Sequence, residues 1–231
     1  MDTPIKRFKS DFKTITHYYT LLVEETKNQR LVGSTNEWVL DNYYVISEQD
    51  KVLRIELAGI GRGRRGVSAA RVQVLSEVLQ SYLERCHYQI DKPLLFRYLS
   101  QVQVLRKDYL AYPEVLALVP LLKAILIGEL ASLCRTMEQE GAYRYVPTDK
   151  RQADMEHLNR SAQENLLMMN IFNSLKKMAK LPTAELVDAV SFQERMLKQE
   201  AVGMYDQMQD RTKEDYRARI TRLSRKHKVS E

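Results

Sequence analysis

Apolar residues are densest between Pro113 and Cys134, and this segment organises the predicted fold. Pro113 suits the first turn of a helix, where its missing N–H would have no partner anyway. Pro120 lies inside the segment, where it would remove one backbone hydrogen bond and kink the helix. The longest uncharged apolar run, Val115 to Leu122, has eight residues, whereas a membrane-spanning helix needs about 20. The pattern therefore predicts a buried, kinked central helix and no transmembrane segment.

Apolar residues elsewhere recur in steps of three and four, the spacing of a helix with one buried face. Asp91 is placed to cap the helix that begins at Pro93, and Thr212 to cap the last one. We predict an all-α protein, an irregular multi-helix bundle around the central helix. Residues 1–231 form a single helical domain, which could divide into 1–141 and 148–231. The further helices are expected near residues 8–31, 36–57, 68–86, 93–102, 155–172, 185–199 and 212–228.

The only glycine-rich segment is GIGRGRRG at residues 59–66. Gly61, Gly63 and Gly66 match the G-x-G-x-x-G spacing of a dinucleotide-binding turn, which requires a strand before it and a helix after it. The preceding KVLRIEL continues a helical segment, and no alternation of strands and helices follows. We therefore expect a basic loop between two helices and no cofactor.

Charge and cysteine content place few further limits on function. The net charge is +6, but 36 basic residues are interspersed with 30 acidic ones, so no nucleic-acid partner is expected. Cys86 and Cys134 form no paired metal spacing and indicate no disulfide framework. The first thirty residues contain no apolar signal core. We expect a cytoplasmic location.

Spacings typical of catalytic and metal sites are missing. The four histidines lie far apart, and none belongs to an H-x-x-H or Cys/His ligand pattern. Cys86 and His87 are neighbours, but adjacent helical residues point about 100° apart and form no hydrogen-bonded dyad. No Asp-x-Asp, G-x-S-x-G or Walker pattern occurs. We predict no catalytic residue, no cofactor and no metal, and that the chain alone is not an enzyme.

The C-terminal segment from Arg211 to Lys228 has eight Lys or Arg against two acidic residues. It could contact the phosphate groups of a membrane surface, or it could be a solvated helix with its cations near its C-terminus. Tyr216, Ile220 and Leu223 lie on one side of this helix and could instead dock on protein. The candidate anion contacts are Arg217, Arg219, Arg222 and Arg225.

Trp38 and Asn42 lie four residues apart and therefore share a helix face. An indole beside an amide could stack on a sugar ring and hydrogen-bond its hydroxyl groups. The alternative is a buried Trp with a hydrogen-bonded polar neighbour that fixes helix packing. The second interpretation is favoured, because helical periodicity alone indicates no glycan groove.

Three separated segments resemble the region that precedes the transferase domain in bacterial cyclic β-1,2-glucan synthases. NEWVLDNYYVISEQ (36–49) is similar to that family's Glu-Trp-Leu-Leu-Asp-Asn-aromatic signature, and EVLALVPLLKAILIGEL resembles its proline-containing apolar helix. SFQERMLKQEAVGMYDQMQDRTKEDYR (191–217) resembles a later block, with substitutions at 209–210 and 213–214. The matching positions are Glu37, Trp38, Leu40, Asp41, Asn42, Pro120, Gly203, Tyr205, Met208, Thr212, Asp215, Tyr216 and Arg217.

The resemblance implies a fragment or relative of a large, membrane-bound enzyme that polymerises glucose from UDP-glucose. Its transferase, cyclising and phosphorylase-like domains lie beyond the region resembled here, so no catalytic residue is carried over. The expected role is a non-catalytic accessory domain, whose partner is a transferase domain or membrane-embedded synthase at the inner face of the bacterial membrane. The alternative is a stand-alone helical adaptor that binds a protein or an anionic surface through its basic C-terminal helix.

Overall fold

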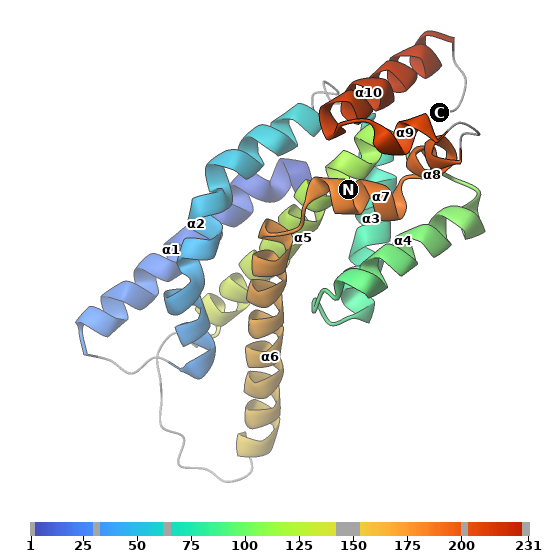
Figure 1. The fold of residues 1–231 in the computed structure, drawn as a ribbon. Coiled ribbons are helices and arrows are strands. Elements are labelled where there is room, and N and C mark those ends of the chain that lie inside the picture. Colours follow the sequence, from blue (N-terminus) through green and yellow to red (C-terminus); the bar gives the residue numbers. More distant parts are fainter. Residues whose placement is uncertain (1–2, 30–32, 62–65, 142–152, 200–202, 228–231) are drawn as a thin grey trace.

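The computed structural model describes residues 3–29, 33–61, 66–141, 153–199 and 203–227, which form ten helices and no strand (Figure 1). The prediction of an all-α multi-helix bundle is therefore confirmed. The helices are α1 (Pro4–Lys27), α2 (Ser34–Gly61), α3 (Ala69–Arg85), α4 (Lys92–Arg106), α5 (Tyr112–Gln139), α6 (Ala153–Ala179), α7 (Thr183–Val190), α8 (Phe192–Lys198), α9 (Met204–Gln207) and α10 (Asp210–His227).

Helix α5 is the central element, as its apolar composition predicts. It contacts α1, α2, α3, α6, α7 and α10, so most of its circumference is covered by protein. Helical structure continues through the buried Pro120. Because apolar residues occupy most of its faces, burial removes a large apolar area from water. Its fully buried side chains include Val115, Leu118, Leu121, Leu126, Leu130 and Cys134.

Polar contacts fix the start of α3 against the start of α5. The Arg71 guanidinium donates from Nε and Nη2 to the two carboxylate oxygens of Glu114, at 2.6 and 3.0 Å. Its Nη1 donates to Asp108 in the preceding turn, at 2.6 Å. Such bidentate, charge-assisted pairs define orientation as well as distance. They set the position of α3 along α5.

Helix α6 joins the two parts into which the sequence could divide. Its Ser174 accepts a hydrogen bond from the Ile90 amide at 2.8 Å and donates to the Tyr88 carbonyl at 2.7 Å. Lys177 donates to the Ile90 carbonyl at 2.9 Å. The turn between α3 and α4 is therefore hydrogen-bonded to α6. Helix α6 also packs against α2 and α5.

Helix boundaries follow the predicted capping residues in some places and depart from them in others. Asp91 caps α4, since its carboxylate accepts a hydrogen bond from the Leu94 amide at 3.0 Å. The single helix predicted over 185–199 is wrong, because Ser191 has extended backbone angles and separates α7 from α8. Its hydroxyl accepts from the Glu194 amide and caps α8. Thr212 is not a cap, because α10 already begins at Asp210.

The glycine-rich segment contains no strand in its described part. Helix α2 continues through KVLRIEL to Gly61, as the helical interpretation predicted. Gly66 has φ 78°, a backbone conformation that glycine adopts without strain. Gly63 lies outside the described residues.

By length and composition, α5 is the one helix of the described residues that could span a membrane. Its most apolar window has a mean hydropathy of 2.0. Within the protein, 67% of that window is buried, and the core helix of a soluble protein meets the same criteria. The absence of a transmembrane segment therefore stays a prediction.

Candidate functional site

Side chains from α9 and α10 meet at the carboxylate of Glu194, which lies on α8. Its Oε2 accepts a hydrogen bond from Arg217 Nε of α10 at 2.7 Å and another from the Tyr205 hydroxyl of α9 at 2.8 Å. Glu194 and Tyr205 are each 1% exposed, and Arg217 is 6% exposed. The Arg217 guanidinium also lies over the Tyr112 ring of α5, 5.6 Å from its centroid. This Glu194 cluster fastens α8, α9 and α10 to the start of the central helix.

The electrostatics of the Glu194 cluster favour its charged state. Burial alone would raise the pKa of Glu194, but hydrogen bonds from Arg217 and Tyr205 leave that pKa below its ordinary value. Burial opposes the charge of Arg217, yet the bond to Glu194 raises the Arg217 pKa above its ordinary value. An arginine that stays protonated does not act as a general base. The cluster is therefore a buried ion pair that links α8 to α10.

Arg217 is not available as an anion contact, which corrects the prediction made from the basic composition of the C-terminal segment. Its guanidinium is directed into the protein, because Glu194 supplies a buried carboxylate at hydrogen-bond distance. Arg219 and Arg222 are exposed, as that prediction requires. The side chain of Arg225 lies outside the described part of the chain.

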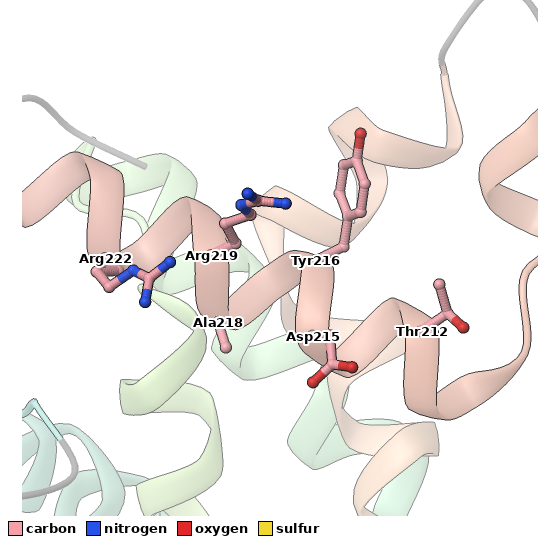
Figure 2. A pocket seen from close by; sticks show the side chains of 6 residues that line it. All are labelled: Thr212, Asp215, Tyr216, Ala218, Arg219 and Arg222. Atoms are coloured by element: carbon pink, nitrogen blue, oxygen red, sulfur yellow. The ribbon is translucent and has the colours of Figure 1, made fainter.

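The outer face of α10 combines apolar and cationic side chains. Tyr216 is 47% exposed and Leu223 is 49% exposed. Ile220 beside them is half-buried. Figure 2 shows Arg219 and Arg222 projecting from the same helix, where they line an open hollow of about 600 Å³. Residues Thr212, Asp215, Tyr216 and Ala218 of α10 complete its described lining.

The inner face of α10 is polar, which is the reverse of an ordinary amphipathic surface helix. Its buried residues are Arg217, Thr221 and Ser224, at three- and four-residue spacing. The Thr221 hydroxyl has no hydrogen-bond partner among the described residues. Attachment of α10 therefore depends on the Glu194 cluster more than on apolar burial, and the larger apolar side chains are left on the outside.

Trp38 and Asn42 have the role in helix packing that the sequence favoured over a sugar contact. The Asn42 side chain is 7% exposed, and its amide donates to the Trp38 carbonyl at 2.9 Å. Its oxygen accepts from Lys176 of α6 at 2.6 Å. Trp38 is half-buried and packs against the core. Because Asn42 is committed to two partners, these residues hold α2 against α6 and do not present a paired surface to a sugar.

The other positions of the family resemblance do not converge. Gly203 has φ 64° in the left-handed region, just before α9, where a side chain would be strained. Leu40 and Met208 are half-buried, and Pro120 is buried in α5. The exposed positions are Glu37 and Asp41 on α2, Gly203 before α9, and Thr212, Asp215 and Tyr216 on α10.

The described residues contain no group of three His, Cys, Asp or Glu side chains that could hold a metal. Burial raises the pKa of the Cys86 thiol, and it raises that of Cys134 to about 12. A catalytic thiol requires the opposite shift. Neither cysteine therefore has the properties of an activated nucleophile.

Sequence reasoning missed Glu194, the residue on which the cluster depends. It lies among charged residues of a short helix, Arg195 and Lys198 included, where an acidic side chain ordinarily faces solvent. No local spacing marks its pairing with Arg217, which lies 23 residues later. Tyr205 and Arg217 both match the family within the segment 191–217. This shared segment was the available indication that the two residues act together.

No protein-family model matches the chain. No curated protein matches it either. The geometry of the Glu194 cluster and of the outer face of α10 is therefore the basis for a functional assignment.

Proposed function

We propose that this chain is a non-catalytic helical accessory domain of a bacterial cyclic β-1,2-glucan synthase. On this proposal it lies in the cytoplasm at the inner face of the membrane, and the outer face of α10 packs against the transferase portion of the larger protein. The proposal combines the resemblance of three sequence segments with a surface suited to protein contact.

The observation that carries the proposal is the exposure of Tyr216 and Leu223 on a helix whose inner face is polar. Tyrosine and arginine are enriched in protein interfaces, and exposed apolar groups rimmed by polar residues mark such contacts. Arg219 and Arg222 provide that polar rim. The rigid attachment of α10 through Glu194 would present this face in a fixed orientation, which lowers the entropic cost of docking.

The roles of the family-like residues also support a structural function. Gly203 supplies a left-handed turn, and Tyr205 and Arg217 both bind Glu194. A sequence block that positions α9 and α10 would be retained for assembly even when the chain performs no chemistry.

The docking proposal is tested with the transferase portion of a cyclic β-1,2-glucan synthase that lacks its own N-terminal region. We expect the wild-type chain to bind it in titration calorimetry, and Tyr216→Ser with Leu223→Ser to weaken binding at least about tenfold. The matched control is Leu105→Ser with Val104→Ser, which removes exposed apolar groups from α4. Equal losses in both double variants, or no binding by the wild type, would refute the proposal.

Absence of catalysis is a separate part of the proposal. We expect no β-1,2-glucan when the purified chain is incubated with labelled UDP-glucose. Any such product would show that the chain carries transferase activity of its own.

The alternative function is an adaptor that binds an anionic surface through α10. It is favoured by the exposure of Arg219 and Arg222 beside Tyr216. This function predicts sedimentation with vesicles of anionic phospholipid, falling steeply as salt rises and abolished by Arg219→Glu with Arg222→Glu. Salt-resistant docking on the transferase portion, lost on removal of Tyr216 and Leu223, would instead support the accessory domain.

A further inference from the structure

The outer face of α4 carries large apolar side chains that the described protein leaves uncovered. Leu94 is 51% exposed, Val104 is 56% exposed and Leu105 is 82% exposed. Leu94 and Leu105 point within about 20° of each other and lie about 16 Å apart along the helix axis. Arg97 and Gln101 lie between them, and both are exposed. These five residues form one line along the outside of the helix, the α4 stripe.

The inner face of α4 keeps the α4 stripe directed outward. Leu95 and Leu99 are buried. The buried side chain of Gln103 donates a hydrogen bond to the Val190 carbonyl of α7 at 3.1 Å. Helix α7 is the main contact of α4, and Figure 1 shows α4 at the edge of the molecule. Since the buried residues lie on the opposite side of the helix, the α4 stripe faces away from the core.

The unpaired charge along α4 is positive. The helix from Lys92 to Arg106 contains no acidic residue. Arg97, Arg106 and the following Lys107 are exposed, and none of them forms an ion pair with a described residue. Two of these cations lie at the end of the helix that carries Leu105. The apolar side chains are therefore accompanied by charges that suit an anionic partner.

The acidic residues nearest to α4 have partners of their own. Asp91 accepts a hydrogen bond from the backbone at the start of the helix and caps it. Asp108 accepts from Arg71 at 2.6 Å. Glu185 of α7 forms an ion pair with Lys92. These carboxylates are engaged within the protein, so they do not neutralise the free cations by direct contact.

Further apolar side chains gather just beyond the C-terminal end of α4. Tyr109 is 43% exposed, and its ring stacks on that of Phe192 of α8, with 4.3 Å between the centroids. Arg195 lies over the Phe192 ring, and Met196, one helical turn after Phe192, is 52% exposed. Tyrosine is enriched where proteins meet the boundary between membrane and water. This end of α4 thus repeats the combination of apolar and cationic groups.

We propose that the outer face of α4 lies on a membrane of anionic phospholipid. The apolar side chains of the α4 stripe enter the boundary between headgroups and acyl chains, and Arg97, Arg106 and Lys107 meet the lipid phosphates. Helices that lie in this boundary combine an apolar face, buried about 5–10 Å deep, with basic residues that attract anionic lipid. A fluid surface accommodates a row of protruding side chains, whereas a protein partner would need a matching pocket for each. The contact involves no residue of α10.

Sedimentation with phosphatidylcholine vesicles that contain about 30% phosphatidylserine tests the proposal. We expect the wild-type chain to bind them less tightly as salt rises, and not to bind vesicles of phosphatidylcholine alone. Leu94→Ser with Leu105→Ser should weaken binding at least about tenfold, because apolar insertion is lost. Arg97→Gln with Arg106→Gln should weaken binding and reduce its dependence on salt.

The matched control is Val52→Ser with Ile55→Ser, which removes similarly exposed apolar groups from α2. We expect this variant to bind the vesicles as the wild type does, and circular dichroism should show that every variant is folded. Insertion is measured separately with Leu105→Trp, whose fluorescence should be quenched by phospholipids brominated in their acyl chains. Val52→Trp should not be quenched, and Trp38 contributes the same background to both variants.

Several results would overturn the proposal. They are an equal loss of binding in the α2 control, no binding of the wild type, and no quenching of Leu105→Trp. Equally tight binding to soluble polyglutamate would show that the face accepts an acidic polymer and needs no membrane. Vesicle binding abolished by Arg219→Glu with Arg222→Glu, but kept in Leu94→Ser with Leu105→Ser, would place the lipid contact on α10. None of these outcomes bears on docking to the transferase portion.

Discussion

The core around α5 and the C-terminal segment α8–α10 are held together by different kinds of contact. In the core, leucines and valines at three- and four-residue spacing are removed from water, and Leu118 and Leu121 are fully buried. In the C-terminal segment, α10 turns a polar face inward, and one ion pair between Glu194 and Arg217 anchors it. Apolar burial is non-directional and cumulative, whereas a buried ion pair depends on geometry and on both partners being present.

This difference explains why α5 supports many neighbouring helices, whereas α10 is held in one orientation with apolar side chains exposed. Buried apolar area tolerates small displacements, so α5 can hold many neighbours at once. The Glu194 cluster fixes a single arrangement of α10 and leaves Tyr216 and Leu223 exposed. Each region should therefore respond to its own class of substitution.

The largest expected effect is in the core. Leu118→Ala removes a fully buried side chain and should lower the free energy of unfolding by about 2–5 kcal/mol in urea denaturation. Leu105→Ala is the control, because Leu105 is 82% exposed and should change the free energy by no more than about 0.5 kcal/mol. Similar values for the two variants would mean that α5 is not the centre of the core.

The next effect is in the Glu194 cluster. Glu194→Ala leaves Arg217 buried without its carboxylate and should weaken attachment of α10 by about 3 kcal/mol, detected as faster amide exchange in α9 and α10. Glu185→Ala is the control, since it breaks an exposed ion pair with Lys92 and should cost about 0–1 kcal/mol. Unchanged exchange in α10 after Glu194→Ala would show that apolar contacts suffice to hold it.

A smaller effect is that the stabilising contributions of Glu194 and Asp11 depend on pH in opposite directions. The pKa of Glu194 lies below its ordinary value of 4.5, so its stabilising contribution is present above that pH and is lost as the pH falls through the lowered pKa. Burial raises the pKa of Asp11 above its ordinary value of 3.8, although Arg7 and Arg135 oppose the shift. Its contribution is therefore greatest below 3.8 and is lost as the pH rises through the raised pKa.

Urea titrations of Glu194→Ala and Asp11→Asn across the acidic range measure these opposite slopes. The stability advantage of the wild type over Glu194→Ala should shrink on acidification. Relative to the wild type, Asp11→Asn should gain stability as the pH rises. Parallel slopes for the two variants would contradict the assigned pKa directions.

Sequence patterns predicted the core well, because helical periodicity and capping are local. Asp91 was recognised as a cap from its place before a helical pattern, and the apolar density of 113–134 identified the central helix. The break at Ser191 was missed, because serine is also tolerated inside helices. The Glu194–Arg217 pair was missed because it joins residues distant in sequence, and composition alone assigned Arg217 to the surface.

Native-state hydrogen exchange of the intact chain at increasing urea tests the central claim most directly, since it reports the opening free energy of each helix separately. We predict that α5 amides exchange only through global unfolding, and that α10 amides exchange through a smaller opening that Glu194→Ala makes easier. If α10 amides exchange with the same free energy as those of α5, and Glu194→Ala lowers both equally, the two regions form one cooperative unit and the account is contradicted.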